Sequence, residues 1–450
     1  MCMIGETYSY KNIWRIAYPI IIGNLAQDLL TVVDTAFVGQ LGEIPLAAAA
    51  IGSIFYLAIV MLGWGFALGV QILIARKLGE GNLKDIQKIV NHSFLVLLLL
   101  TSSIFIALHF YSHQLFGSML QSADVTRESL KFLDIRIYGI FAAFMNMNFR
   151  AFYIGIAKTK IISITTVIMA LVNFVLDYFL IFGKGPFPNM GIEGAALASV
   201  IAEFVALFIF IYYTGQNAES KKLIGVGKPS FEVPLFKTIF RISTPTMLQH
   251  FVSFSAWFIF FLFVEKMGET PLAISNIIRS IYLLILVPIF GFASATNTLV
   301  SYSIGKGEST WMVPIIKKAL GLSFVFIGVL ASITLLFSTE ILHLYTSDDI
   351  IIEKALPALY VILAASFTLA FGIILFQAVA GTGRTNISLV IEIVVICFYL
   401  SGVYALTHFG NTRIEVVWLL EFLYGLGLGI TSILYLKAVP IKIFKGTKNQ

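Results

Sequence analysis

The sequence has very little charge for its length. Of its 450 residues, only 12% are Asp, Glu, Lys or Arg, whereas soluble domains average about 25%. Cysteine is scarcer still, because Cys2 and Cys397 are the only two and cannot form a disulfide framework. We expect no cleavable signal peptide, since the first apolar segment, from Trp14 to Phe37, is too long and lacks a small-residue cleavage site. A soluble enzyme and a disulfide-rich secreted domain are therefore both poor descriptions of this chain.

What the chain has in abundance is apolar residues in long runs. Hydrophobic residues make up 58% of it, and the mean hydropathy is +0.92. Runs such as Phe94 to Phe110 and Ala319 to Phe337 approach the roughly 20 apolar residues that a helix needs to cross a bilayer. Apolar windows between charged or Gly/Pro-rich breaks predict an all-α polytopic membrane protein with about twelve transmembrane helices. Their expected limits are 13–38, 46–74, 89–110, 132–156, 160–182, 191–214, 238–264, 272–303, 313–337, 355–380, 387–408 and 415–437.

Basic residues are distributed unequally between the two sides of the membrane that these spans define. With the N-terminus inside, the inner segments hold many, including Arg76, Lys84 and Lys88, and the outer segments hold few, such as Arg127. This asymmetry satisfies the positive-inside rule and predicts a multi-pass protein of the inner or plasma membrane with both termini cytoplasmic. The net charge of +6 is therefore an orientation signal and does not indicate nucleic-acid binding.

The two halves of the chain repeat one another. The segment Arg15-Ile16-Ala17-Tyr18-Pro19 recurs as Arg241-Ile242-Ser243-Thr244-Pro245, an offset of 241 − 15 = 226 residues. The same offset carries Gly79-Glu80-Gly81 onto Gly305-Lys306-Gly307. Each copy crosses the membrane an even number of times, so two parallel six-helix repeats around a central cavity are expected, with alternating access between the lobes. The expected parts are an N-terminal lobe (1–214), a cytoplasmic linker (215–237) and a C-terminal lobe (238–450).

Acidic residues inside the spans are the main candidates for function, because a carboxylate at mid-bilayer is costly and usually faces protein or water. Polar residues of the first span recur at helical spacing and form one stripe: Asn24, Gln27, Asp28, Thr31 and Asp34. Asp34 lies centrally in this stripe, where desolvation favours its protonated form, so it can carry a proton or bind Na⁺. The alternative for Asp34 is a structural acid whose neighbours satisfy it. For Asp28 this alternative has the same weight as a functional role, because Asn24 and Gln27 are its helical neighbours.

A second polar pair lies in the fifth span. Asn173 and Asp177 are four residues apart, so both project from one helix face. An amide beside a carboxylate suits a proton-linked hydrogen bond or a hard cation, which makes Na⁺ at Asp34, Asn173 and Asp177 possible; no other metal site is expected. The alternative is a pair that only joins helices. The second repeat has different residues at the positions of Asp34, Asn173 and Asp177, namely Phe260, Tyr399 and Val403. The N-terminal lobe is therefore expected to be the ion-coupling half.

Other polar residues of the spans are predicted to play secondary parts. Glu203 and Asn146 are expected to extend the network of Asp28, Thr31 and Gln27, with Arg150 and Asn146 as partners of Glu203. The alternative for Arg150 is that its side chain snorkels to the inner membrane surface. Pro19 removes a helix hydrogen bond and is expected to be the hinge of the helix that carries Asp34, a static kink being the alternative.

Substrate-cavity candidates and two further acids complete the prediction. The cavity candidates, for which simple packing is the alternative, are Tyr56, Trp64, Gln249, His250 and Trp257. Glu392 and Glu421 are further buried acids whose role the sequence does not assign.

These features together resemble the multidrug and toxic compound extrusion (MATE) transporters. The likeness spans nearly the whole chain and is carried by four segments besides Pro19: Asp34-Thr35-Ala36-Phe37-Val38-Gly39, Ala75-Arg76-Lys77-Leu78-Gly79-Glu80-Gly81, Leu176-Asp177-Tyr178-Phe179-Leu180-Ile181-Phe182-Gly183 and Gly191-Ile192-Glu193-Gly194-Ala195-Ala196. Asp34 together with Asn173 and Asp177 is similar to the DinF-like branch of that family.

The resemblance implies a secondary active antiporter for multidrug efflux. Its substrates would be cationic, amphipathic xenobiotic compounds, exchanged for inward H⁺ or Na⁺, with Asp34 and Asp177 as the coupling carboxylates. It implies no cofactor beyond the ion, a monomer, and membrane lipids as the other partners. Relatives often carry a tyrosine where this chain has Leu30. Fewer oxygen ligands make H⁺ the preferred ion.

Three other functions fit less well. A lipid-linked oligosaccharide flippase of the same superfamily fold would hold phosphate with several basic residues, and only Arg150 and Arg279 lie well inside the spans. A membrane enzyme would need a metal or nucleophile cluster, whereas the six histidines are scattered. A passive channel would show uncoupled flux.

Overall fold

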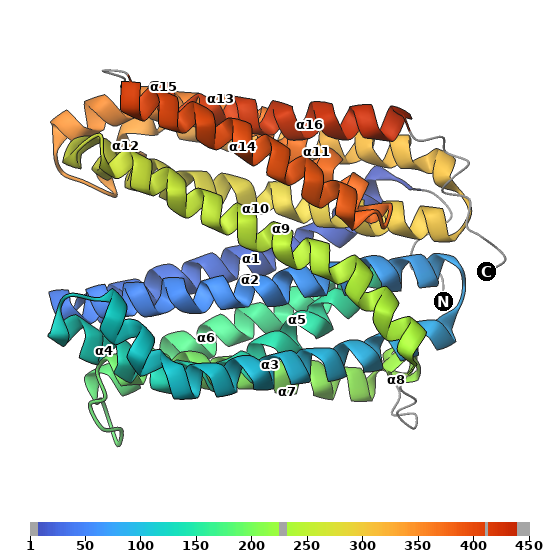
Figure 1. Ribbon diagram of the computed structural model, residues 1–450, viewed down its shortest axis with the longest axis horizontal. Coiled ribbons are helices and arrows are strands. Elements are labelled where there is room, and N and C mark those ends of the chain that lie inside the picture. Colours follow the sequence, from blue (N-terminus) through green and yellow to red (C-terminus); the bar gives the residue numbers. More distant parts are fainter. Residues whose placement is uncertain (1–7, 225–231, 410–412, 439–450) are drawn as a thin grey trace. The chain divides into compact units, whose positions relative to one another are not determined.

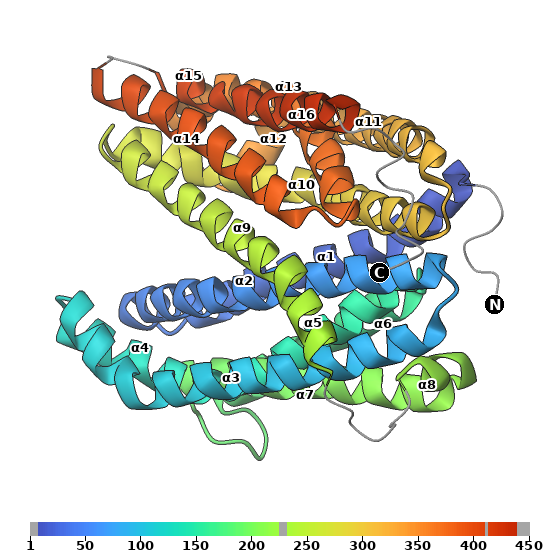
Figure 2. The same cartoon turned by 45° about the vertical axis from the view of Figure 1, so that its right-hand side comes forward.

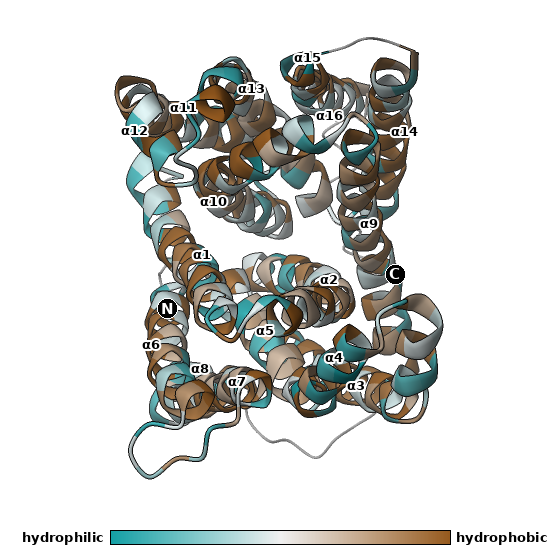
Figure 3. Ribbon diagram, turned by 90° about the vertical axis from the view of Figure 1, so that its left-hand side faces the viewer, coloured by the Kyte–Doolittle hydropathy of each residue, from teal (hydrophilic) through white to brown (hydrophobic). Residues whose placement is uncertain are grey.

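The computed structural model describes residues 8–224, 232–409 and 413–438. These ranges contain helices and turns but no strand, and eleven of their helices are long and apolar enough to cross a membrane. Figure 3, coloured by hydropathy, shows apolar residues along most of the long helices. The prediction of an all-α polytopic membrane protein is confirmed.

The helices follow the two repeats along the chain. Those of the first repeat are α1 (Tyr10–Gly39), α2 (Glu43–Gly79), α3 (Leu83–Met119), α4 (Ala123–Arg136), α5 (Gly139–Gly155), α6 (Lys160–Phe182) and α7 (Ile192–Gln216). The short α8 (Ala218–Ile224) follows. Those of the second repeat are α9 (Val233–Glu265), α10 (Glu269–Gly305), α11 (Met312–Leu336), α12 (Ser338–His343), α13 (Asp349–Gly381), α14 (Thr385–Phe409), α15 (Ile414–Trp418) and α16 (Leu420–Ala438), with a 3₁₀ turn at Ser309–Trp311. The bounds of α2 shifted by 226 residues are those of α10, since 43 + 226 = 269 and 79 + 226 = 305.

Two expected segments look different in the structure. The predicted span 132–156 is divided between α4 and α5, and α5 has 17 residues, which leaves eleven long helices where the sequence predicts about twelve spans. The expected linker 215–237 begins with the end of α7 and with α8, and α9 starts at Val233. Residues 225–231 of this linker, like Cys2, lie outside the described residues.

Several helices begin where the sequence supplies an N-cap. The side chains of Asn82, Ser122 and Asp348 accept hydrogen bonds from backbone N–H groups in the first turns of α3, α4 and α13. Such caps satisfy N–H groups that have no partner inside the helix. These local signals separate neighbouring helices in a chain that is apolar almost throughout.

Packing divides the chain into two compact units. Unit A consists of Ile22–Ile74 and Asn82–Ser243, and unit B of Met1–Ile21, Ala75–Gly81 and Thr244–Gln450. The division falls inside α1 and α9, close to Pro19 and Pro245, which lie within these helices. The packing units therefore do not coincide with the two sequence repeats.

Each unit is a helical bundle with its own apolar core. In unit A, α7 lies against α5 and α6, and α3 packs on α5 (Figure 2). One of its core clusters joins Val38 of α1, Ala48 of α2, Phe132 of α4 and Ile192 of α7. In unit B, α13 packs against both α10 and α16 (Figure 1), and α10 and α13 are the most buried of the long helices.

The end of α2 and the end of α10 cross within unit B at two glycines. A Cβ on Gly79 would overlap the carbonyl oxygen of Tyr302, and a Cβ on Gly305 would overlap that of Arg76. The same 226-residue offset relates both pairs, since 76 + 226 = 302 and 79 + 226 = 305. The duplication has therefore produced a pseudo-symmetric helix crossing that requires glycine on both sides.

We expect Gly79→Ala and Gly305→Ala to destabilise the protein by about 1–3 kcal/mol each, because backbone carbonyls cannot move aside for the added methyl group. The measurement is Tm in detergent. Gly328→Ala, in the middle of α11 where nothing lies within 4 Å of the new Cβ, is the matched control and should leave Tm unchanged or slightly raised. Equal Tm changes in all three variants would contradict this account of the crossing.

Candidate functional site

Unit A brings together the three residues predicted to couple ions. Asn173 and Asp177 on α6 are fully buried, and Asp34 on α1 is half-buried beside them. The hydrogen-bond pattern orients the Asn173 amide so that its nitrogen faces both acids. It then donates to Asp34 Oδ1 at 2.6 Å and to Asp177 Oδ2 at 3.2 Å, while its oxygen accepts from the Ser199 backbone N–H at 3.3 Å. One amide thus links the acids of two helices.

The two carboxyl groups also lie within hydrogen-bonding reach of each other. Two ionised carboxylates in such positions repel each other strongly, so a pair of this kind can share a single proton. Asp177 Oδ1 is buried and has no donor among the described residues. A proton on one of the two carboxyls would supply that donor.

The donor set around Asp34 and Asp177 is small. With the amide nitrogen turned toward the acids, the oxygen of Asn173 is engaged by Ser199 and does not face Asp34 or Asp177. A sodium site needs several oxygens that converge on one point. Among the described residues, no group of three or more His, Cys, Asp or Glu side chains is arranged to hold a metal ion.

An ion pair that the sequence analysis did not anticipate lies in the same unit. Arg136, the last residue of α4, donates from Nη1 to Glu203 Oε2 at 2.9 Å and from Nη2 to Glu203 Oε1 at 2.5 Å. Its guanidinium lies 3.8 Å from the ring centroid of Tyr56, whose hydroxyl donates to Glu203 Oε2 at 3.5 Å. Asn146 donates to the backbone carbonyl of Glu203 at 2.9 Å. The partner of the Glu203 carboxylate is therefore Arg136, and Arg150 is engaged elsewhere.

Arg150 joins Asn24, the first residue of the α1 stripe, to the helical bundle of unit A. It donates to Asn24 Oδ1 at 3.0 Å and to Thr166 Oγ1 at 3.2 Å, and it lies 5.0 Å from the ring centroid of Trp64. This arginine, which the sequence left open as a snorkelling residue, is thus held inside unit A.

The remaining stripe residues lie apart from the acid pair. Gln27 and Thr31 are exposed, and the Thr31 hydroxyl donates to the Gln27 backbone carbonyl of its own helix. Asp28 is half-buried. Of the five stripe residues, only Asp34 is brought to Asn173 and Asp177.

The two buried glutamates of the second repeat, Glu392 and Glu421, lie in unit B and accept hydrogen bonds from hydroxyl groups. Glu421 accepts from Tyr282 at 2.9 Å and from Tyr399 at 2.8 Å. Glu392 accepts from Ser253 at 2.7 Å and from Tyr424 at 2.8 Å. Each acid thus has two hydroxyl donors.

The counterparts of Asp34 and Asn173 remain neighbours in unit B. Phe260 and Tyr399 stack with ring centroids 6.2 Å apart and an interplanar angle of 25°. The Trp418 ring packs edge-on against Phe260 at 5.2 Å. The repeat has therefore kept the position of this contact and replaced its acid and amide by aromatic rings.

The cavity candidates of the second repeat are also in unit B. Gln249 is buried, and its Oε1 has no partner among the described residues. His250 Nδ1 lies 2.9 Å from the Thr246 carbonyl of its own helix, and Trp257 stacks on Tyr282 with centroids 5.7 Å apart.

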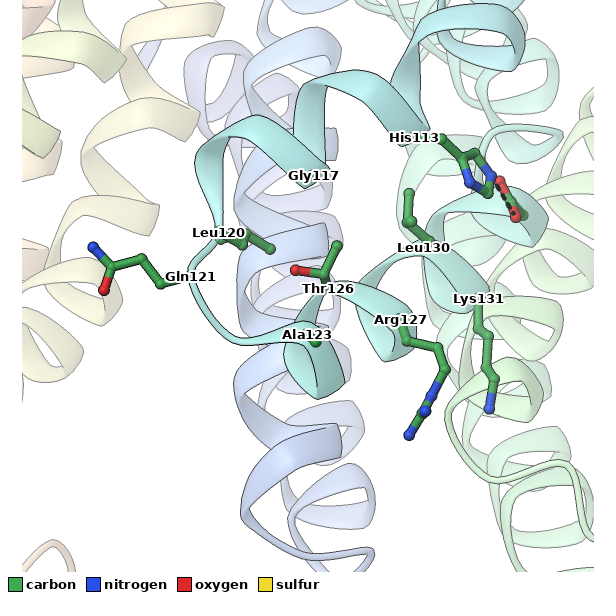
Figure 4. Close-up of a pocket in the computed structure, with 10 residues that line it drawn as sticks. His113, Gly117, Leu120, Gln121, Ala123, Thr126, Arg127, Leu130 and Lys131 are labelled. Carbon is green, nitrogen blue, oxygen red and sulfur yellow. Dashed lines mark hydrogen bonds and ion pairs between the residues drawn. The ribbon is translucent and has the colours of Figure 1, made fainter.

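A cavity of about 620 Å³ lies in unit A around the connection between α3 and α4 (Figure 4). It contains none of the predicted site residues. Its charged side chains are exposed and paired: His113 Nε2 lies 3.3 Å from Asp134 Oδ2, and Arg127 Nη2 lies 2.9 Å from Asp124 Oδ1. This hollow at the ends of two helices is therefore separate from the candidate site.

Sequence reasoning overlooked Arg136 because it sits at the edge of an expected span, where a basic residue usually reaches for the membrane surface. The available signal was its position in the first repeat. At the 226 offset Arg136 is replaced by Ile362, as Asp34 is by Phe260. Arg136 and Asp34 thus share one feature of the sequence: each is a charged residue whose counterpart in the second repeat is apolar.

Comparison with known proteins agrees with the repeat and with the fold. The MatE family model matches the chain twice, over residues 19–179 and 245–405, which are again 226 residues apart. A probable multidrug resistance protein NorM of Thermotoga maritima is 27% identical over 376 residues, covering 83% of this chain and 80% of that protein. The multidrug resistance protein NorM of Vibrio cholerae is 23% identical, covering 78% and 76%.

Solved structures share the fold over almost the full length. The outward-facing conformation of a multidrug resistance MATE family transporter gives a TM-score of 0.90 at 22% identity, covering 97% of this chain and 96% of that one. A MOP superfamily transporter from Pyrococcus furiosus gives 0.89 at 22% identity, with 97% of both chains covered.

Proposed function

Because this chain belongs to the MatE family, we propose that it is a secondary antiporter for multidrug efflux, exporting cationic, amphipathic compounds, and that inward movement of H⁺ through the Asp34–Asp177 pair drives the export. The transport class is supported by the family and by relatives named as multidrug resistance proteins. The acid on α1 favours a place in the DinF-like branch.

One observation carries the choice of ion. Two carboxyls within hydrogen-bonding reach, bridged by the Asn173 nitrogen, form a site for a single shared proton. When the proton leaves, the two acids repel each other, and α1 and α6 are driven apart at this point. Proton binding is thereby converted into a movement of α1.

The proposed cycle uses Pro19 as the point where α1 bends. Uptake of a proton from outside joins Asp34 to Asp177 and lowers the affinity for the organic cation, which leaves outward. Release of the proton to the inside restores the affinity. Linkage requires that proton and substrate weaken each other's binding by the same factor. Trp64, Gln249, His250 and Trp257 remain the predicted substrate contacts, whereas Tyr56 is buried against Arg136 and Glu203 and is not one of them.

The membrane location, the topology and the oligomeric state of the protein are part of the same proposal. The chain is a multi-pass membrane protein by its helices and family. We place it in the inner or plasma membrane with both termini cytoplasmic, in keeping with its basic residues, and expect a monomer in contact with lipid to be sufficient.

The test is transport of ethidium by purified protein in proteoliposomes, with a pH gradient and a Na⁺ gradient imposed separately. We expect the pH gradient to drive ethidium against its concentration and the Na⁺ gradient to have no effect. Export driven only by Na⁺ would overturn the choice of ion. Flux that runs only down the ethidium gradient would overturn the antiporter and indicate a channel.

A further inference from the structure

The Arg136–Glu203 ion pair is largely shielded from solvent. The side chains are only 12% and 14% exposed, and the two parallel N–H···O bonds form the bidentate geometry that gives such pairs their specificity. Tyr56, itself buried, covers one face of the guanidinium. The pair is thus fixed in position, with little freedom to reach solvent.

Stability alone gives no reason for the pair. A buried ion pair contributes little more to stability than well-packed apolar residues of similar volume. The second repeat shows the apolar alternative, with Ile362 and Gly429 at the equivalent positions, while Tyr56 is retained there as Tyr282. The pair is therefore specific to the repeat that has Asp34 and Asp177.

The backbone is also modified around the pair. The helix is interrupted between Arg136 and Gly139, where Tyr138 and Ile140 donate to carbonyls three residues back, whereas the equivalent α13 is continuous. Short 3₁₀ stretches inside a helix often mark functional positions. A Cβ on Gly139 would overlap Arg136 Nη1 and Glu203 Oε2. Glycine and the break together make room for the ion pair.

Arg136 and Asp34 come from neighbouring parts of unit A, because Phe132, one turn before Arg136, shares a core cluster with Val38, one turn after Asp34. At this position Arg136 acts electrostatically on Asp34. Asp177 from α6 interacts with Asp34 directly, whereas Glu203 from α7 and Tyr56 from α2 contact Arg136. Asp28 of the same helix lies apart from the acid pair, and Arg150 of α5 is held by Asn24 and Thr166. Arg136 is thus the nearby positive charge, and Glu203 partly neutralises it.

We propose that Arg136 and Glu203 are positioning residues that set the pH at which the Asp34–Asp177 pair takes up and releases its proton. Arg136 stabilises the ionised acid, and Glu203 fixes the guanidinium and limits its effect. Without Arg136 the acid pair would keep its proton to higher pH; with an unpaired Arg136 it would lose the proton at lower pH. This inference rests on the proposed proton coupling.

The experiment measures the protonation of the Asp34–Asp177 pair directly, by infrared spectroscopy of the full-length protein in detergent. The carboxylic C=O band that disappears in Asp34→Asn is followed against pH. We expect Arg136→Gln to raise the midpoint pH of this band and Glu203→Gln to lower it, each by about one pH unit. The double variant Arg136→Gln/Glu203→Gln replaces the ion pair by two neutral amides, and Arg136→Lys keeps the positive charge. The midpoint pH of both variants should lie near that of the wild type.

Arg127→Gln is the matched control, because Arg127 is on the same helix but exposed, and its midpoint should not move. If the ion pair only held helices together, Arg136→Gln and Glu203→Gln would lower Tm but leave the midpoint unchanged or move it in the same direction; either result overturns the inference. Failure of the proposed function looks different, because Asp34→Asn would then remove no titrating band from the spectrum.

Discussion

Asp34→Asn should reduce proton-driven ethidium export to the leak rate of protein-free vesicles. The substitution keeps the size and polarity of the side chain but removes the group that shares a proton with Asp177. Ethidium binding should persist and lose the pH dependence that the shared proton gives it, because linkage between proton and substrate requires the group that titrates. Transport in proteoliposomes and binding to the purified protein at several pH values measure the two effects.

Asp28→Asn is the matched control for this experiment. Asp28 is an acid of the same helix, half-buried like Asp34, and we expect transport to continue at nearly the normal rate. Asp177→Asn should reproduce the loss seen with Asp34→Asn, since the proton belongs to the pair. Normal export by Asp34→Asn vesicles under an imposed pH gradient would show that the coupling site lies elsewhere.

Glu421→Leu should strongly destabilise the protein and leave proton coupling in place. Glu421 is the acceptor for the buried hydroxyls of Tyr282 and Tyr399. Its removal leaves both without this acceptor, at about 1–3 kcal/mol for each hydroxyl that finds no new one. Thermal unfolding in detergent measures the loss of stability. Export per folded molecule, followed against the pH gradient, measures coupling.

Two further variants of α16 serve as controls for Glu421→Leu. Glu421→Gln keeps an acceptor for the tyrosines and should retain most of the stability and all of the coupling. Leu423→Ala, at a side chain that is 46% exposed, should leave Tm almost unchanged. Loss of pH-driven export in Glu421→Gln would assign a coupling role to the second repeat and would contradict the expected division between the two halves.

Long apolar runs and local capping signals made the helices predictable. Each helix satisfies its own backbone hydrogen bonds, so its existence depends on nearby residues only. The α2 and α10 helices show this most clearly, because each begins at a Gly-Glu-x-Pro-Leu-Ala segment and ends at a Gly-x-Gly segment, and their bounds correspond in both repeats. The break between α4 and α5 was not predicted; it lies beside an ion pair between Arg136 and a residue 67 positions away.

The site was predictable where one helix sets the geometry. Asn173 and Asp177 are four residues apart, and their shared face follows from helical periodicity. The partner of Glu203 was not predictable in the same way. Arg150 and Arg136 both precede it in one expected span, and only the packing of α4 against α7 shows that Arg136 forms the pair.

The sequence by itself determined that this chain is a helical membrane protein built by duplication, with acids in one copy that the other lacks. Composition and periodicity suffice for this, because bilayer thickness and helical spacing translate directly into residue patterns. The tertiary structure decided which polar groups meet: Asp34 with Asp177 through Asn173, Arg136 with Glu203, and Glu421 with two tyrosines. Such contacts join residues far apart in the chain, so their partners depend on how the helices pack, a property that no single segment of the sequence contains.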